Sequence, residues 1–358
     1  MLYNLLYPLS DQYGVLNVFR YITFRTTYAI ITALVLAFIL GPPLIRYLTR
    51  KNFGEKINGH LPGHAPKAGT PTMGGVLLIL SLLVPTLLWA DLTSGIVWVA
   101  VLSVILYGGI GLLDDIIKLK NSEGLSVKAK LALQIAAAIP ILWVASGITG
   151  FDGEFTKLQI PFFKNVRPDL GVFYFVFAVL VIVGASNAVN LTDGLDGLAI
   201  GPIIISFAAY AFISYVSGHG KFAGYLQIPF IKGLGELTVI CGAAVGASLG
   251  FLWFNSYPAQ IFMGNTGSTA MGALLGVVAI LTKHEIILIL VGGIFVVEAL
   301  SVIIQVGYFK MTGKRVFLMA PLHHHYEKKG WSEPKVIIRF WIIAILLALI
   351  SLSTLKLR

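Results

Sequence analysis

Two adjacent acids, Asp114 and Asp115, are the residues of this chain best suited to chemistry. They end a long apolar run. A carboxylate near lipid carries a high free-energy cost, so acids at such places usually have a function. Neighbouring side chains on a helix point about 100° apart, so the two acids cannot address one ligand atom in the same way. We expect different roles, one beside a metal ion and the other as a base. A pair of solvated acids at the membrane interface fits the pattern equally well.

A second polar cluster runs from Asn187 to Gly197, between two strongly apolar runs. Asp193 and Asp196 are three residues apart, so they are expected to share one face of a helical turn. Together with Asn190 they offer a row of oxygen atoms suited to Mg²⁺ or to the edges of a sugar and a base. An EF-hand is excluded, because its loop needs about twelve residues ending in Glu. An ordinary turn needs no more than one Asp and one Gly, so a functional site is favoured here.

A loop containing Gly and Pro, from Lys67 to Gly75, leads into an apolar run. Thr70 or Thr72 is expected to cap the helix that follows. The free backbone N–H groups at such a helix start suit a phosphate, and Lys67 adds a positive charge. A plain loop-to-helix turn explains this cluster equally well.

Two further clusters lie later in the chain. Asn255 begins one, which continues from Phe262 to Ser268; Phe262 can stack on a base or simply pack, and Ser268 can donate to a phosphate. The other is the run His323, His324 and His325, and contiguous histidines rarely all reach one zinc ion. We therefore favour phosphate contacts or proton handling for the histidines.

Glu298 is a lone acid within an apolar run. Such residues usually mark function. A structural role, bracing a bent helix near Gly292 and Gly293, fits the sequence equally well.

The elements that must position these residues are membrane-spanning helices. A spanning helix needs about 20 mostly apolar residues. Ten stretches fit this description, and they are approximately 22–48, 72–90, 95–113, 129–147, 171–189, 197–216, 236–254, 260–281, 286–308 and 336–355. The first twenty residues lack the pattern of a cleaved signal peptide, and a short interfacial helix is expected there.

Composition excludes the other classes of protein. The chain is 57% hydrophobic and 12% charged, whereas a soluble domain is roughly 45–50% apolar and about 25% charged. The apolar runs do not alternate as the strands of a membrane barrel do. The single cysteine, Cys241, permits no internal disulfide. An all-α integral membrane protein is therefore predicted, and no nucleic-acid partner is expected.

Basic residues set the predicted orientation. Of the 26 Lys and Arg residues, 16 fall on one side of the membrane, which the positive-inside rule assigns to the cytoplasm. Both termini are then on the non-cytoplasmic side. All the polar clusters share the cytoplasmic side, so we expect a single polytopic domain over 1–358 with active-site loops at 49–71, 114–128, 190–196, 255–268 and 309–335.

These motifs together resemble the phospho-N-acetylmuramoyl-pentapeptide transferase family (MraY), within the polyprenyl-phosphate N-acetylhexosamine-1-phosphate transferase superfamily. The resemblance runs nearly end to end, and the triple-histidine loop is more particular to MraY than the aspartate motifs are. It rests on 69–75, Asp114-Asp115, 187–197, 250–255, 262–264 and 320–327.

The resemblance implies an activity and its partners. Family members transfer phospho-MurNAc-pentapeptide from UDP-MurNAc-pentapeptide to undecaprenyl phosphate, giving lipid I and UMP, and they require Mg²⁺. It also implies the bacterial inner (cytoplasmic) membrane, a cytoplasmic active site and a homodimer. The physics agrees, because phosphoryl transfer needs positioning, a metal ion and positive charge on the phosphates.

Site roles carry over residue by residue. Asp114 matches the candidate base and Asp115 the acid near the metal ion, with His323, His324 and His325 on the phosphate side. The expected substrate-binding residues are Lys67, Thr72, Lys118, Asn187, Asn190, Asp193, Asp196, Asn255 and Phe262, of which Lys67 and Lys118 would hold the diphosphate.

One position departs from the family. The family has a Mg²⁺-binding Asp after Met-Gly, and this chain has Asn265. A neutral amide oxygen is a weaker partner for a hard dication. We therefore predict severely reduced metal binding and turnover for this chain.

Two other functions fit part of the pattern. One is a sister transferase that loads a different sugar phosphate onto the same lipid, against which the triple-histidine loop argues. The other is a non-catalytic lipid-binding or transport protein. Transport needs a path near the midplane of the membrane, whereas the polar clusters here are confined to one side.

Overall fold

The computed structural model is an all-α bundle. It describes the chain except for residues 52, 54–68, 122–123, 149–150, 152, 162, 164–165 and 357–358. Within the described residues there is no β-strand, only an isolated bridge between Lys157 and Asp169. The elements are α1 (Leu2–Leu6), η1 (Tyr7–Asp11), η2 (Gly14–Arg20), α2 (Ile22–Arg50), α3 (Gly75–Trp89), α4 (Gly95–Asn121), α5 (Val127–Ser146), α6 (Phe173–Thr192), α7 (Ile200–Ser217), α8 (Gly220–Leu226), α9 (Gly235–Asn255), α10 (Gly264–Leu281), α11 (Leu288–Val291), α12 (Gly293–Thr312), α13 (Leu322–Lys328) and α14 (Glu333–Thr354).

Ten apolar helices correspond to the ten predicted stretches. Among the described residues, nine are long and apolar enough to cross a membrane, and the tenth, α3, has 15 residues. The prediction of an all-α integral membrane protein is confirmed. The chain also begins with short helices (α1, η1 and η2), as expected.

Several predicted boundaries are wrong. The stretch 286–308 is not one helix, because the chain breaks at Gly292 between α11 and α12. The loop predicted at 114–128 begins too early, since α4 continues to Asn121 and carries both acids within the helix. Likewise the loop predicted at 255–268 ends at Gly264, where α10 starts. Hydropathy marks where lipid ends, and a helix can continue beyond that point.

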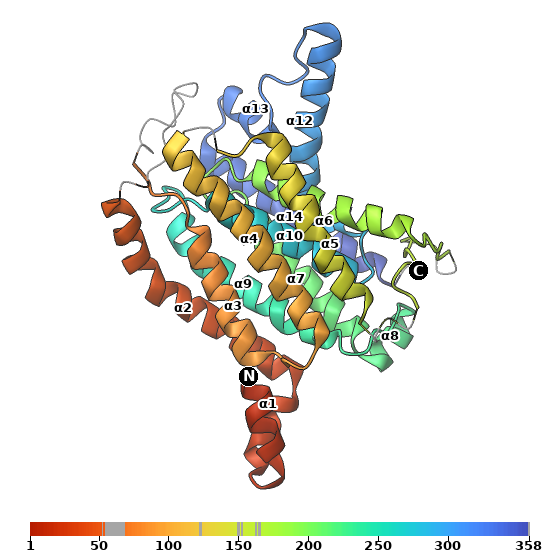
Figure 1. The fold of residues 1–358 in the computed structure, drawn as a ribbon. Coiled ribbons are helices and arrows are strands. Elements are labelled where there is room, and N and C mark those ends of the chain that lie inside the picture. The colour runs from red at the N-terminus through yellow and green to blue at the C-terminus, as the bar shows by residue number, and fades with distance from the viewer. Residues whose placement is uncertain are drawn as a thin grey trace.

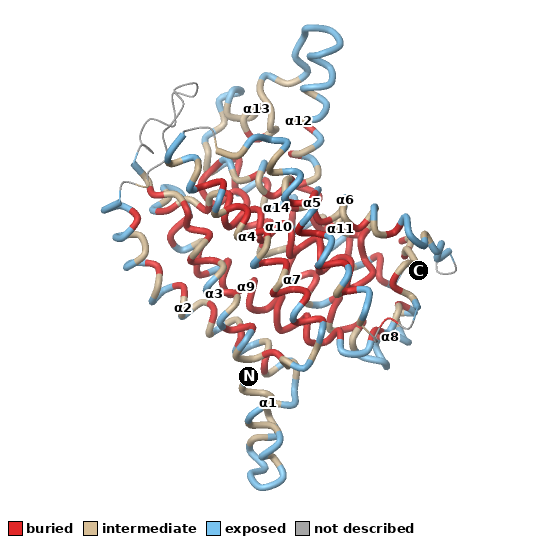
Figure 2. The backbone as a smooth tube through the Cα atoms, viewed as in Figure 1, coloured by how far each residue is buried: buried red, intermediate tan, exposed pale blue. Residues whose placement is uncertain are grey.

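Helix α10 lies at the centre of the bundle (Figure 1). It packs mainly against α4 and α6, while α9 packs against α2 and α7. Every residue of α10 from Asn265 to Leu281 is buried, and Figure 2 shows the same concentration of buried chain at the centre. Helix α13 and the end of α12 lie at one end of the molecule, and α1 projects from the opposite end (Figure 1).

Glycines bring α3 and α4 against the start of α10. A Cβ atom on Gly75 of α3 would overlap the backbone of Gly267, and one on Gly111 of α4 would overlap the carbonyl of Asn265. No larger residue fits at either contact unless the helices separate. These two close approaches place the acids of α4 beside the first turn of α10.

Candidate active site

Asp115 caps the first turn of α10. Its Oδ1 atom accepts hydrogen bonds from the backbone N–H and the side-chain amide of Asn265, at 3.1 and 3.0 Å. Its Oδ2 atom accepts from the backbone N–H and the hydroxyl of Thr266, at 2.9 and 2.7 Å. The N–H groups of a helical first turn have no partner within the helix and carry a partial positive charge. A carboxylate supplied by α4 therefore satisfies them and holds α10 in place.

Asp114 has different partners, as the sequence predicts for neighbours on a helix. Its Oδ2 atom is 3.0 Å from Lys130 Nζ, and its Oδ1 atom accepts the Leu125 N–H at 2.7 Å. The carboxylate is almost fully buried, and Lys130 is the more accessible partner, with 16% of its side chain exposed. A buried charge is tolerated when it is paired and hydrogen-bonded in this way.

Asn265 joins three of the predicted clusters. Its Oδ1 atom accepts hydrogen bonds from Asn190 Nδ2 at 2.6 Å and from Lys130 Nζ at 3.3 Å. The Asn190 amide also donates to the Ser268 hydroxyl at 2.7 Å, and that hydroxyl donates to the Gly264 carbonyl. We call Asp114, Asp115, Lys130, Asn190 and Asn265 the polar network. It unites residues of α4, α5, α6 and α10.

Sequence reasoning missed Lys130 as a site residue. It counted this lysine only among the basic residues that orient the chain. The available signal was its place about one turn into a helix that follows the aspartates, with Ser126 as the helix cap. In the structure, the Lys130 ammonium group contacts both Asp114 and Asn265.

The oxygen atoms of the polar network do not form a ready magnesium site. Both oxygens of Asp115 and the side-chain oxygen of Asn265 already accept N–H or O–H donors. Mg²⁺ prefers octahedral oxygen ligands, supplied by carboxylates, water and substrate phosphates. In the described part of the chain no three or more His, Cys, Asp or Glu side chains gather as metal ligands. The residues as arranged therefore do not fit the ion.

The loop that follows α6 differs from its prediction. Helix α6 ends at Thr192, so the expectation that Asp193 and Asp196 share a face of a helical turn is wrong. Asp193 is half-buried, whereas Asp196 is buried and accepts the Ala259 N–H at 3.0 Å. Asn255 accepts the Gly197 N–H at 3.1 Å and donates to the Ile261 carbonyl at 2.9 Å. These contacts fasten the loop to the segment that leads into α10.

Asn187 lies deeper on α6 and joins that helix to α5. Its amide donates to Gln134 Oε1 at 2.7 Å and to the Val183 carbonyl at 2.8 Å. It therefore fixes α5 to α6 one helical turn before Asn190, next to the polar network.

The start of α3 does not offer the predicted phosphate site. Helix α3 begins at Gly75 with no side-chain cap, so the expectation that Thr70 or Thr72 caps it is wrong. The N–H groups of Gly74 and Gly75 donate to the carbonyls of Phe262 and Met263, both at 2.8 Å. The backbone itself uses these donors, because the 262–263 segment crosses directly over the start of the helix.

Other predicted residues border this region. A Cβ atom on Gly264 would lie 3.0 Å from Thr72 Oγ1 and 2.9 Å from Asp115 Oδ2, so Thr72 lies close to the network. Phe262 is half-buried, and Lys118 is exposed on the last turn of α4. Lys67 lies outside the described residues.

The three histidines have separate environments. His323 is fully buried, and its Nδ1 atom lies 3.2 Å from Glu298 Oε2. Burial lowers the pKa of the His323 imidazole, and Glu298 opposes this effect. His324 Nδ1 is 2.6 Å from Glu327 Oε2, and His325 Nδ1 accepts the Leu318 N–H at 3.1 Å. The run therefore does not present three equivalent ligands to one ion.

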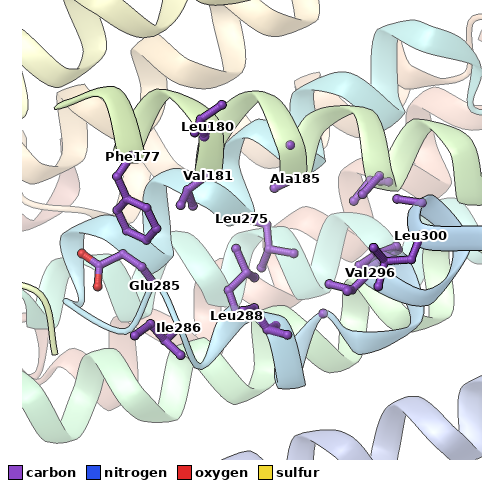
Figure 3. A pocket seen from close by; sticks show the side chains of 17 residues that line it. Phe177, Leu180, Val181, Ala185, Leu275, Glu285, Ile286, Leu288, Val296 and Leu300 are labelled. Atoms are coloured by element: carbon purple, nitrogen blue, oxygen red, sulfur yellow. The ribbon is translucent and has the colours of Figure 1, made fainter. Parts of the chain in front are cut away.

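A mostly apolar groove of about 280 Å³ runs along α6, with Glu285 as the charged residue of its lining (Figure 3). Its lining includes Phe177, Val181 and Ala185 of α6, and Val296 and Leu300 of α12. The lining reaches Val189, immediately before Asn190. From Phe177 to Val189 a helix rises by about 18 Å. The groove therefore has the length and the lining for an extended apolar chain.

The fold and site define the class: a membrane protein built of apolar helices, with a buried polar network between them and a mostly apolar groove along α6. The family model for glycosyl transferase family 4 matches residues 97–283. The first signature of phospho-N-acetylmuramoyl-pentapeptide-transferase matches residues 67–79.

Three similar proteins are all named phospho-N-acetylmuramoyl-pentapeptide-transferase. They come from Citrifermentans bemidjiense, at 55% identity, and from Desulforapulum autotrophicum and Syntrophus aciditrophicus, both at 56%, with the whole of each chain covered. The chain belongs to the phospho-N-acetylmuramoyl-pentapeptide-transferase family, whose members are transferases of peptidoglycan synthesis. It is thus a multi-pass bacterial membrane protein, and the family predicted from the sequence motifs is confirmed.

Proposed function

We propose that this chain transfers phospho-MurNAc-pentapeptide from UDP-MurNAc-pentapeptide to undecaprenyl phosphate. The observation that carries the proposal is the convergence of Asp114, Lys130, Asn190 and Asn265 in one buried network, in a helical bundle that also has a mostly apolar groove. The network offers charged and polar groups to the phosphates, and the groove offers an apolar surface to a lipid chain. The relatives' name supplies the group that is transferred.

The reaction is a phosphoryl transfer. An oxygen of the lipid phosphate attacks the phosphorus attached to the sugar, and UMP leaves. The product, lipid I, then carries a diphosphate between lipid and sugar. Catalysis of this kind depends on positioning and on positive charge near the phosphates. Lys130 is the partly accessible cation of the polar network, and Lys118 lies exposed one helical turn beyond Asp114.

Asp114 is our candidate base for the lipid phosphate. Its carboxylate is held by Lys130 and the Leu125 N–H, so its position is set before substrate arrives. Asp115 holds the start of α10 through its four hydrogen bonds. The histidines, with Asn190, Asp193, Asp196, Asn255, Phe262, Thr72, Asn187 and Lys67, remain proposed contributors on the substrate side.

Magnesium enters the proposal through position 265. The resemblance implies Mg²⁺, which would neutralise phosphate charge in this reaction. The amide of Asn265 instead donates to Asp115 and accepts from Asn190. We therefore propose that this chain binds Mg²⁺ poorly and turns over slowly compared with an Asn265→Asp variant.

We further propose one domain over 1–358, placed in the inner membrane as a homodimer, with both termini outside. The site then faces the cytoplasm. The two other candidate functions are a sister sugar-phosphate transferase and a non-catalytic lipid-binding or transport protein.

The testing experiment is Mg²⁺-dependent UMP release from UDP-MurNAc-pentapeptide and undecaprenyl phosphate, for this chain and for Asn265→Asp. Turnover by the variant alone supports both the transferase and the role of position 265. Full activity of the original chain would remove the proposed role of position 265. Turnover only with a different UDP-sugar would favour the sister transferase, and no turnover by either folded protein would favour a non-catalytic function.

A further inference from the structure

Two side chains of α12 hold the segment that leads into the histidines, one at residues 316–317 and the other at residues 322–323. Glu298 accepts the Leu322 N–H through Oε2 at 2.7 Å and the His323 N–H through Oε1 at 3.1 Å. Gln305 accepts the N–H groups of Val316 and Phe317 through Oε1, at 3.1 and 2.9 Å. We call this pair of side chains the α12 clamp.

The spacing of the α12 clamp suits its task. Glu298 and Gln305 are seven residues apart, which is about two helical turns and places them on one face of α12. Between the two attachment points the chain leaves the helix end, turns and enters α13. The backbone of residues 316–323 is thus fixed to α12 at its beginning and at its end.

In the part of the chain that the structure describes, the Glu298 carboxylate serves the first turn of α13. Its side chain has no exposed area, and an ionised group in such a place is costly unless hydrogen bonds and charges compensate it. The acceptor contacts seen for its carboxylate all go to the first turn of α13 and to the imidazole of His323. The carboxylate is therefore committed to the histidine segment.

The clamp also determines what His323 touches. One side of the imidazole faces Glu298, with Nδ1 at 3.2 Å from the carboxylate. On the other side, a Cβ atom on Gly194 would overlap His323 Nε2. The ring is therefore wedged between α12 and the loop that follows α6, next to Asp193. Any shift of Glu298 must move His323 relative to this loop.

We propose that Glu298, assisted by Gln305, is a positioning residue for phospho-sugar transfer. It sets α13 and His323 against the Asp193–Gly197 loop, and it does so from the helix whose Val296 and Leu300 line the apolar groove. One rigid helix thereby keeps the groove and the histidine segment in register. This inference rests on the proposed transferase function.

The first test measures the clamp without activity. Hydrogen–deuterium exchange of the peptide covering 318–328 is compared between the full chain and Glu298→Gln in detergent. The amide nitrogen of Gln replaces one acceptor oxygen and faces an N–H donor, so exchange at residues 322–323 should rise by about tenfold or more. Ser301→Ala is the matched control, because the Ser301 hydroxyl bonds only within α12 in the contacts seen, and it should leave this peptide unchanged.

Unchanged protection at 322–323 in Glu298→Gln would overturn the proposal. If that variant does not fold, Gln305→Ala tests the other end. It removes the acceptor for residues 316–317, so their exchange should rise while the transmembrane peptides keep their protection. Unchanged exchange at residues 316–317 would again overturn the proposal.

The second test asks whether Glu298 and His323 act together in catalysis. It is made in the chain with Asn265 or with Asp at that position, whichever shows turnover. Glu298→Gln and His323→Ala should each lower kcat by about tenfold or more, with little change in KM for the nucleotide substrate. If Glu298 acts through His323, the double variant should lose no more than the stronger single variant. Multiplying losses would overturn the positioning role. Absence of turnover in both backgrounds would refute the transferase instead, and the exchange measurement would still decide the clamp.

Discussion

Asn265→Asp is the substitution for which the structure makes the sharpest prediction. The amide nitrogen of Asn265 now lies 3.0 Å from Asp115 Oδ1. Replacing it with oxygen turns a hydrogen bond into a contact between two carboxylates. At an effective dielectric constant of about 20, two like charges about 4 Å apart repel by about 4 kcal/mol. Lys130, at 3.3 Å from the side-chain oxygen, offsets part of this repulsion.

The net charge of the polar network also predicts that Asn265→Asp destabilises the site unless a cation binds. With Asn265, the network holds two carboxylates and one ammonium group, together with the partial positive charge of the first turn of α10. The excess negative charge is then less than one unit. With Asp at 265 a full further unit is added, and a divalent cation becomes the natural partner. A cation present at 100 times its dissociation constant stabilises the folded state by about 2.7 kcal/mol.

The assay is thermal unfolding in detergent with EDTA and with increasing Mg²⁺. Asn265→Asp should melt at a lower temperature than the original chain in EDTA and recover as Mg²⁺ is added, whereas the original chain should respond little. Asn187→Asp is the matched control, since its amide contacts Gln134 and Val183 rather than an acid, and Mg²⁺ should not restore its stability. Equal stabilisation of the original chain and Asn265→Asp by Mg²⁺ would refute the reasoning.

Four other predictions concern the network and its supports. Asp114→Asn should lower the rate of UMP release about 10²–10⁴-fold, measured with whichever residue at position 265 gives turnover, and an unchanged rate would contradict its role as the base. Lys130→Met should lower the free energy of unfolding by about 3–5 kcal/mol, because it leaves the Asp114 carboxylate buried without its ion pair. An unchanged melting temperature would contradict that pairing. Asn255→Ala removes two hydrogen bonds that join the end of α9 to Gly197 and Ile261, and it should cost about 1–3 kcal/mol. The measurement is the melting temperature in detergent, and an unchanged value would show that these bonds do not hold the neighbouring loops. Gly75→Ala should prevent the accumulation of folded protein, because its methyl group would overlap the backbone of α10. The control is Gly109→Ala in α4, which has no atom within 4 Å of the new methyl group and should become more stable by about 0.5–1 kcal/mol. Equal yields of the two folded variants on size-exclusion chromatography would contradict this packing.

The apolar helices could be predicted from the sequence because a membrane imposes a length and a composition on them. Their ends could not. Helix α4 continues beyond its apolar part to Asn121, where propensity and tertiary contacts decide, not lipid. The break at Gly292 is also hidden, since the residues around it are uniformly apolar and only the glycine pair hints at it.

The site was predicted in parts rather than as a whole. Residue types identified the polar clusters, but the pairing of Asp115 with the start of α10 joins residues 150 positions apart. A polar residue that fastens a loop looks the same in a sequence as one that faces a substrate. Asn255 is expected at the substrate, yet the contacts seen for it go to backbone atoms. Lys130 was hidden among the other basic residues for the same reason.

The position of Lys130 suggests how substrate binding and base activation are linked. Lys130 is the partly accessible member of its pair with Asp114, so an arriving phosphate meets the ammonium group first. As that group turns towards the phosphate, the Asp114 carboxylate loses its ion partner and keeps the Leu125 N–H. The oxygen of Asp114 that Lys130 now occupies then becomes free to accept a hydrogen bond, while Leu125 still fixes the other oxygen. We therefore expect phosphate binding to open the position at which Asp114 can receive a donor from the substrate side.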